Sequence, residues 1–148
     1  MKPSHFNLRV YGLLVNTRNE ILLSEETYKG RAFTKFPGGG VQLGEGIEEA
    51  LHRELKEEAN LKIRIKRLVH VSGQYIASAF DDSQVIGVYY LIEALHEPDL
   101  TFKELISEAG KTQNYHWVPL QDMPPEHLSF PMDQAAWQSF KSQDTADK

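Results

Sequence analysis

The chain has 148 residues, of which 41% are hydrophobic and 25% charged, with no cysteine and a formal net charge of −5. We expect one domain over residues 1–148 with a core at about 6–140, because chains of this length bury enough surface to fold as one unit. The composition excludes disordered and fibrous classes, and the lack of cysteine excludes disulfides, cysteine-ligated zinc and cysteine nucleophiles. The negative charge argues against binding of a nucleic acid polymer through its phosphates.

Most of that charge lies in one short segment. Residues 45–58 contain six glutamates against Arg53 and Lys56, a local charge of −4. The other 134 residues carry 14 basic and 15 acidic side chains, which nearly cancel.

The beginning of the chain predicts strands followed by a loop. Residues 6–16 and 20–24 have the pattern of two strands, and the polar turn at residues 17–19 predicts that they form a hairpin. Residues 28–46 are predicted to be a loop, because Pro37 and the glycines around it interrupt regular structure. No apolar segment typical of a signal peptide precedes the first strand. We therefore expect a cytoplasmic protein.

Two helices and three strands are expected in the rest of the chain. The helices are predicted over residues 47–59 and 131–140, and the strands over residues 61–71, 85–95 and 115–118. The strand at 61–71 is expected to be half-buried, and the almost wholly apolar strand at 85–95 central in a sheet. That strand is too short to cross a membrane, so no membrane partner is expected. The polar tail after Phe140 is expected to fray. This order favours the α/β class, with a mixed sheet and helices packed on it.

Three carboxylates share one face of the first predicted helix. Glu54, Glu57 and Glu58 lie in its last two turns, where the helix dipole disfavours anions and like charges repel. A solvated acidic face is the simpler interpretation of an isolated glutamate pair. Three carboxylates at this end need a stronger compensating charge, and a hard divalent cation, Mg²⁺ or Mn²⁺, with oxygen ligands supplies one.

A glycine run precedes this helix. Gly38, Gly39 and Gly40 have no side chains, so their backbone can approach a ligand closely, and we expect them to bind substrate. The run matches neither the phosphate loop nor the dinucleotide fingerprint. The run indicates a binding site because of its spacing to Glu45 and Arg53.

The segment resembles the Nudix box, Gly-x5-Glu-x7-Arg-Glu-U-x-Glu-Glu-x-Gly-U, in which U is aliphatic. Here the pattern runs from Gly39 through Glu45 and Arg53-Glu54-Leu55 to Glu57-Glu58 and Leu61. Eight of its nine fixed positions match. The departure is Asn60 in place of glycine, at a helix end where a left-handed residue is needed and asparagine is the next-best choice.

The resemblance implies an α/β/α sandwich with a mixed β-sheet, and hydrolysis of a nucleoside diphosphate linked to another moiety. It also implies that Glu57 and Glu58 are the principal ligands of the metal ion, and that Glu54 is a further ligand or the base that activates water. The Gly39 carbonyl would be another ligand. Arg53 would orient the glutamates and Glu45 would support them.

Some parts of the expected site lie outside the box. Many Nudix enzymes supply another carboxylate from the loop before the tryptophan-containing strand. Glu108 is our choice for it, with Glu104 as the alternative, unless Glu54 acts alone. Tyr75 is a candidate for stacking on a substrate base, as an exposed aromatic side chain can.

Two kinds of function therefore stay open. The first is a Mg²⁺- or Mn²⁺-dependent pyrophosphohydrolase that acts on a nucleoside triphosphate or a nucleotide sugar. The second is a Nudix-fold module that binds nucleotides without turnover, against which the intact Arg-Glu-Leu-x-Glu-Glu sequence argues. An unrelated magnesium or calcium binder is a more distant alternative. The expected partner is a small nucleotide, and a homodimer is expected because homodimers are common in the family.

Overall fold

The computed structural model describes residues 2–101 and 112–146. Its strands and helices follow in the order β1 (His5–Leu14), β2 (Glu20–Tyr28), β3 (Arg31–Lys35), β4 (Gly38–Gly40), α1 (Ile47–Ala59), β5 (Ile63–Val71), β6 (Ser83–Ala94), β7 (Thr112–Pro119) and α2 (Pro131–Ala146). Two short 3-10 turns, η1 (Leu120–Asp122) and η2 (Pro125–His127), precede α2.

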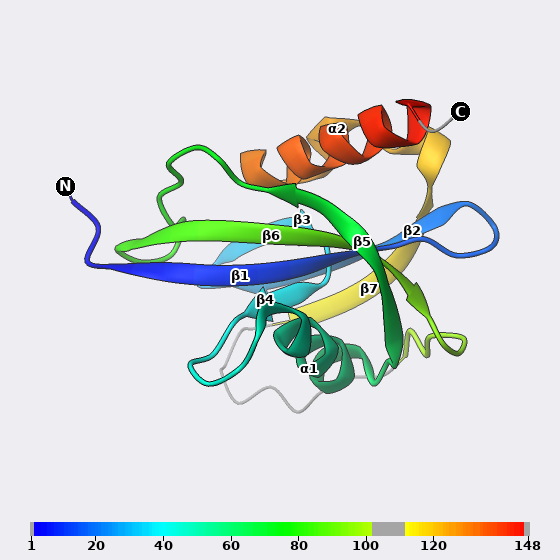
Figure 1. Cartoon of the computed structure of the whole chain (residues 1–148), viewed down its shortest axis with the longest axis horizontal. Helices are drawn as coiled ribbons and strands as arrows, with labels where there is room; N and C mark the ends of the chain where they lie inside the picture. The colour runs from blue at the N-terminus through cyan, green and yellow to red at the C-terminus, as the bar shows by residue number, and fades with distance from the viewer. Residues whose placement is uncertain (1, 102–111, 147–148) are drawn as a thin grey trace.

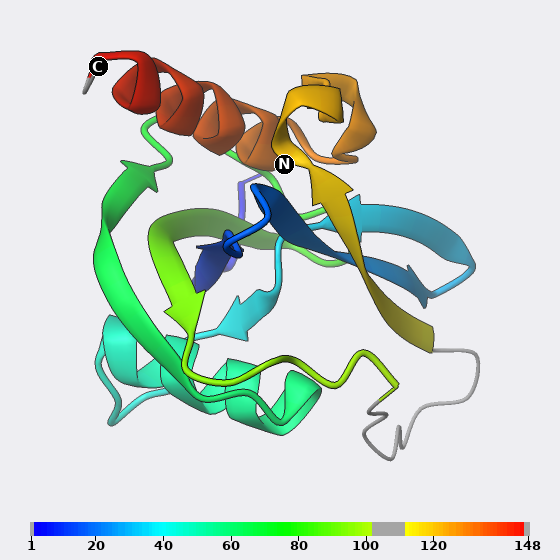
Figure 2. The same cartoon turned by 90° about the vertical axis from the view of Figure 1, so that its right-hand side faces the viewer.

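The strands form two sheets between the two helices. The first sheet has the order β4-β1-β6-β5 and is mixed, because β1 and β6 run parallel while the other neighbours are antiparallel. The second sheet has the order β3-β2-β7 and is antiparallel. Helix α2 lies on one side of the strands and α1 on the other (Figures 1 and 2). The expected α/β/α sandwich with a mixed sheet is confirmed.

The core follows these layers. On the α2 side, Trp137 packs in one buried cluster with Tyr89 and Leu13. On the α1 side, Leu51 and Leu55 pack in a second cluster with strand residues from both sheets. Strand β6 is central in its sheet, between β1 and β5, as its apolar sequence predicts.

The predicted hairpin of the first two strands is wrong. Strands β1 and β2 lie in different sheets, and the chain on either side of the turn is joined by the bridge between Val15 and Ile21 and by hydrogen bonds between Asn16 and Glu20. Both strands carry runs of fully buried residues, so each needs cover on both faces and neighbours on both sides. Strand β1 finds its neighbours in β4 and β6, and β2 finds them in β3 and β7.

The loop predicted over residues 28–46 contains two strands. Strand β4 consists of three glycines that pair with Arg9, Val10 and Tyr11 of β1 through the backbone alone. Glycine and proline are strong loop signals, but strand pairing needs only backbone donors and acceptors, so the composition misled the prediction. Helix α2 also extends to Ala146, beyond the predicted end at Phe140.

Helix α1 has the predicted bounds and a well-defined end at each side. The carboxylate of Glu49 accepts a hydrogen bond from the Gly46 N–H at 3.0 Å, which satisfies a free donor at the helix start. Asn60 follows the last turn with φ 50° and ψ 42°, in the left-handed region, and its N–H donates to the Lys56 carbonyl. Asparagine therefore fills the role that glycine has in the Nudix box.

Within residues 2–101 and 112–146, no helix combines the length and apolar character that a membrane span requires.

Candidate active site

Arg53 joins the acidic residues of the Nudix box to the glycine strand. Its Nε and Nη2 donate to the two carboxylate oxygens of Glu45 at 2.9 and 2.6 Å. Nη2 also donates to the Gly40 carbonyl at 2.9 Å. Nη1 donates to Glu54 Oε1 at 3.0 Å and to Glu57 Oε2 at 3.1 Å. One guanidinium thus joins three carboxylates and strand β4.

The charges of this group stabilise one another. Hydrogen bonds from Arg53 lower the pKa of Glu45 to about 2, and a backbone hydrogen bond from Gln42 acts in the same direction. Glu45 in turn raises the pKa of Arg53, with a smaller contribution from Glu54. Both side chains therefore stay ionised at neutral pH, and Arg53 offsets part of the repulsion among the glutamates.

Strand β4 consists of glycines because of what lies against it. A Cβ atom added at Gly39 would stand 2.4 Å from the carboxyl carbon of Glu54. At Gly38, with φ +152°, an added Cβ would stand 2.1 Å from the Val10 carbonyl oxygen. The glycines thus let α1 approach the strand closely enough for the Glu54 carboxylate to rest on the backbone of β4.

Glu58 points toward the second sheet. Its Oε2 accepts a hydrogen bond from Gln113 Nε2 of β7 at 3.3 Å, and Tyr115 of the same strand also contacts it. Burial raises the pKa of Glu58 to about 7. The nearby positive charge of Lys35 opposes this shift, and the negative charge of Glu54 adds to it. A carboxylate in such surroundings is stabilised by an additional cation.

A buried ion pair extends this polar region. Lys35 Nζ lies 3.1 Å from Glu26 Oε2, and both side chains are about one-tenth exposed. Glu26 also accepts hydrogen bonds from Ser24 Oγ at 2.8 Å and from Gln113 Nε2 at 3.3 Å. Burial is the largest single influence and lowers the pKa of Lys35, but the charges of Glu26, Tyr11 and Glu58 together outweigh it and raise the pKa. The wall of the site opposite α1 is therefore polar and charged.

These wall residues were not among the sequence predictions. Lys35, Glu26 and Gln113 come from three different strands, so no spacing in the sequence links them to the Nudix box. One signal was present: Leu22, Ser24 and Glu26 alternate along one face of β2, and this face changes from apolar to polar. That change marks where the sheet leaves the core and lines the site.

The donors of the box suit a hard divalent cation. Glu54, Glu57, Glu58 and the Gly39 carbonyl offer only oxygen ligands, as Mg²⁺ and Mn²⁺ prefer. The space left by the missing Cβ of Gly39 holds the Glu54 carboxylate beside the glycine backbone. Within residues 2–101 and 112–146, however, no three acidic or histidine side chains converge on one point. Glu54 and Glu57 accept hydrogen bonds from Arg53, whereas Glu58 accepts one from Gln113.

The other predicted site residues lie in different places. Gly38 and Gly40 flank Gly39 in β4, next to the glutamates. Tyr75 lies between β5 and β6 with 60% of its surface exposed, and no interaction within the described residues joins it to the box. Glu108 and its alternative Glu104 lie outside the described residues.

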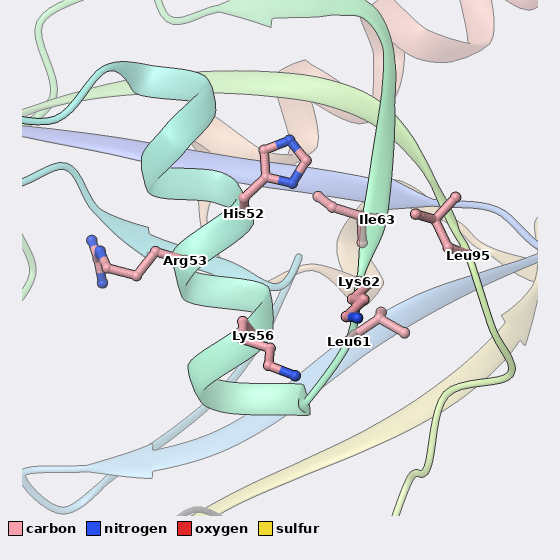
Figure 3. A pocket seen from close by; sticks show the side chains of 7 residues that line it. All are labelled: His52, Arg53, Lys56, Leu61, Lys62, Ile63 and Leu95. Atoms are coloured by element: carbon pink, nitrogen blue, oxygen red, sulfur yellow. The ribbon is translucent and has the colours of Figure 1, made fainter.

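A shallow groove of about 460 Å³ lies on another side of α1. It is lined by Arg53, His52, Lys56, Leu61, Lys62, Ile63 and Leu95. Figure 3 shows the Arg53 side chain pointing across the helix, away from the other six. None of the three glutamates expected to bind metal is among these lining residues, so the groove does not contain the carboxylates of the box.

Comparison with known proteins identifies the family. A family model described as the NUDIX domain matches residues 5–140, and the chain belongs to this family. It is similar to the NAD-capped RNA hydrolase NudC of Pseudomonas syringae pv. syringae, with 28% identity over 128 residues, 82% of this chain and 42% of the relative. It is also similar to the ADP-ribose pyrophosphatase of Methanocaldococcus jannaschii, with 28% identity over 62% of this chain and 53% of the relative.

Solved structures agree with the fold. A NUDIX hydrolase from Nitrosomonas europaea superposes with a TM-score of 0.72 at 17% identity, covering 93% of this chain and 89% of that structure. The chain spans about half the length of the curated relatives it matches.

Proposed function

We propose that the protein is a Nudix pyrophosphohydrolase. It cleaves a phosphoanhydride bond in a nucleoside diphosphate linked to another moiety, with a Mg²⁺ or Mn²⁺ ion held by Glu54, Glu57, Glu58 and the Gly39 carbonyl. The observation that carries this proposal is the Arg53 network, which ties Glu54 and Glu57 to Glu45 and to the Gly40 carbonyl. Such a network holds acidic groups together against their repulsion.

Each residue of the network has a role in this reaction. Water attacks one phosphorus atom, the bond from that phosphorus to the bridging oxygen breaks, and two phosphate-bearing products separate. Glu54 acts as a ligand or accepts the proton that the water loses. Arg53 keeps Glu54 and Glu57 in place, and Glu45 fixes Arg53 from the other side. When bound, the metal ion neutralises phosphate charge and acidifies water.

The substrate class follows from the chemistry that the named relatives share. One is called an NAD-capped RNA hydrolase and another an ADP-ribose pyrophosphatase. NAD and ADP-ribose both contain a nucleoside diphosphate joined to another group. We propose a small nucleotide of this kind, a nucleotide sugar or a nucleoside triphosphate, rather than an RNA end, because the net charge of −5 disfavours a nucleic acid polymer.

A hydrolysis panel tests the proposal. Nucleoside triphosphates, nucleotide sugars, ADP-ribose, NAD and NAD-capped RNA are incubated with Mg²⁺ or Mn²⁺, and the release of phosphate, pyrophosphate or nucleoside monophosphate is measured. Wild-type protein is expected to cleave at least one small nucleotide. Glu57→Gln and Glu58→Gln are expected to lose most of this activity while keeping the fold.

Glu48→Gln is the matched control, because Glu48 is an exposed glutamate in the first turn of the same helix. Full activity of the Glu57→Gln and Glu58→Gln variants would contradict the metal assignment. If no compound is cleaved but nucleotides raise the melting temperature, the non-catalytic binding module is the correct alternative.

Three further assignments are proposed, two of them tested in the same assay and one by light scattering. Glu108→Gln, with Glu104→Gln as its alternative, tests whether either carboxylate takes part in turnover. Tyr75→Ala tests base stacking. If Tyr75 stacks on the base, its loss should raise KM without changing kcat. Light scattering on the purified protein tests the expected homodimer.

A further inference from the structure

Arg9 lies beside the candidate active site and has no role in the proposal above. It stands on β1 directly opposite Gly40, the residue whose carbonyl oxygen accepts from Arg53. Its Nη1 would be 3.8 Å from a Cβ added at Gly40. The Arg9 guanidinium therefore lies beside Gly40 of the edge strand β4, next to Gly39, against which the Glu54 carboxylate rests.

Tyr11 fixes the orientation of the Arg9 guanidinium. The Nε of Arg9 donates to the Tyr11 hydroxyl at 2.6 Å, and the guanidinium carbon lies 5.7 Å from the centre of the Tyr11 ring. The tyrosine ring in turn stacks on Tyr89 with centroids 5.1 Å apart. This anchor occupies one donor of Arg9 and leaves the four N–H groups on its two Nη atoms.

The remaining donors of Arg9 have no carboxylate partner. Within residues 2–101 and 112–146, no Asp or Glu oxygen lies within 4.0 Å of its guanidinium, whereas Arg53 and Arg64 both form ion pairs. Glu54 and Glu26 are near enough to act on Arg9 only through their charge. Burial would lower the pKa of Arg9, but Tyr11 and these carboxylates outweigh it and raise the pKa.

The neighbouring cation cannot take the same role. Lys35 also faces this region, since its Nζ lies 5.3 Å from the centre of the Tyr11 ring. Its ammonium, however, is bound to Glu26 at 3.1 Å and its side chain is only 8% exposed. Arg9 is thus a partly buried cation beside the glutamates, and the Nη groups of its guanidinium stay open to a ligand.

We propose that Arg9 binds the phosphate groups of the substrate, with its two Nη atoms donating to non-bridging phosphate oxygens across the site from Glu54 and Glu58. This proposal rests on the proposed function. A guanidinium suits this role because its planar fork matches two oxygens of one phosphate. Tyr11 acts through Arg9 as a positioning residue. Metal binding to the glutamates would leave Arg9 facing a site whose negative charge is largely neutralised, which further favours an anion there.

Direct binding of a non-hydrolysable diphosphate separates this proposal from the hydrolysis itself. The probe is methylenediphosphonate with MgCl₂, followed by calorimetric titration. Arg9→Gln is expected to weaken binding roughly 10- to 100-fold, as expected for the loss of charge-assisted hydrogen bonds. Arg9→Lys keeps the charge without the fork and is expected to fall between Arg9→Gln and wild type. Arg64→Gln is the control, because Arg64 pairs with Glu93 on the surface.

A double variant tests the role of Tyr11. Tyr11→Phe keeps the ring and removes the acceptor for Arg9 Nε, so it should weaken binding several-fold in the wild-type background. In the Arg9→Gln background it should have no further effect, because both changes act on one interaction. An additive loss would contradict this positioning role.

The outcomes distinguish the two proposals. If Arg9→Gln and Arg9→Lys bind the probe as tightly as wild-type protein does, Arg9 does not bind the phosphates. The hydrolase proposal is unaffected by that result. Wild-type protein that hydrolyses no nucleotide and binds no probe overturns both. If Arg9→Gln does not fold, as judged by circular dichroism, the comparison of Arg9→Lys with wild type still decides the question.

Discussion

The carboxylate of Glu54 occupies the space that a side chain at residue 39 would need. A Cβ atom on Gly39 would stand 2.4 Å from the Glu54 carboxyl carbon and 2.5 Å from each of its oxygens. Gly39, the first residue of the Nudix box, therefore contacts Glu54, which lies fifteen positions further along the chain. The glycine is required for the position of the acid as much as for the shape of the strand.

Gly39→Ala is expected to push the Glu54 carboxylate away from β4 and to lower kcat about 100-fold, since a displacement near 1 Å at a reacting group has an effect of this size. Steady-state hydrolysis of the best substrate from the panel measures it. Gly73→Ala is the control, because nothing lies within 4 Å of a Cβ at that position. Equal activity of the two variants would show that the contact does not position Glu54.

Gln113 is expected to support Glu58, one of the proposed metal ligands. Its Nε2 lies 3.3 Å from Glu58 Oε2 and 3.3 Å from Glu26 Oε2, so it separates two carboxylates and donates to both. Gln113→Leu removes this donor and is expected to raise the Mg²⁺ concentration for half-maximal activity roughly 10-fold, as loss of a group that orients a ligand does. Gln138→Leu, at an exposed position of α2, is the control. An unchanged metal requirement would exclude this role of Gln113.

The helix and the box were predictable from the sequence because they depend on local rules. The apolar stripe of residues 47–59, the acidic first turn and Asn60 at the end all act within one helix, and the structure has the predicted bounds. The pairing of strands was not predictable in the same way. The pattern of β1 shows that it is a strand, but its partner β6 lies more than 70 residues further along the chain.

The opposite wall of the site was missed for the same reason. Arg9, Lys35 and Gln113 belong to β1, β3 and β7, and only the folded sheets bring them to the glutamates of α1. The composition of the glycine strand β4 predicts a loop, whereas its pairing with β1 uses the backbone alone. The residues of the helix and the box could thus be predicted from the sequence. The residues that distant strands bring next to them could not.

The ion pair of Arg53 and Glu45 makes the stability of the protein depend on pH at the acidic end. The folded protein lowers the pKa of Glu45 from 4.5 to about 2. The stabilisation is therefore complete above about pH 4.5 and is lost as the pH falls toward 2. Urea unfolding from pH 6 to pH 3 is expected to show a smaller loss of stability for Arg53→Gln than for wild type and Arg64→Gln. Parallel curves for all three proteins would refute the coupling.

Asp133 is expected to destabilise the folded protein at neutral pH. Its Oδ1 accepts from the Tyr89 hydroxyl, and its buried Oδ2 has no hydrogen-bond partner within the described residues. Burial raises the pKa of Asp133 from 3.8 to about 6, so the folded protein holds this proton more tightly than the unfolded chain does. Its contribution to stability is therefore greatest below about pH 4 and declines as the pH rises through 6.

Asp133→Asn keeps the acceptor for Tyr89 and removes the titration. Relative to wild type, it is expected to gain stability between pH 4 and pH 8, by about 3 kcal/mol at most for a pKa shift of roughly two units. Urea unfolding at several pH values measures the difference. Asp122→Asn, at an exposed position, should show no such gain. A difference between Asp133→Asn and wild type that stays constant across this range would mean that Asp133 does not titrate there in the folded protein.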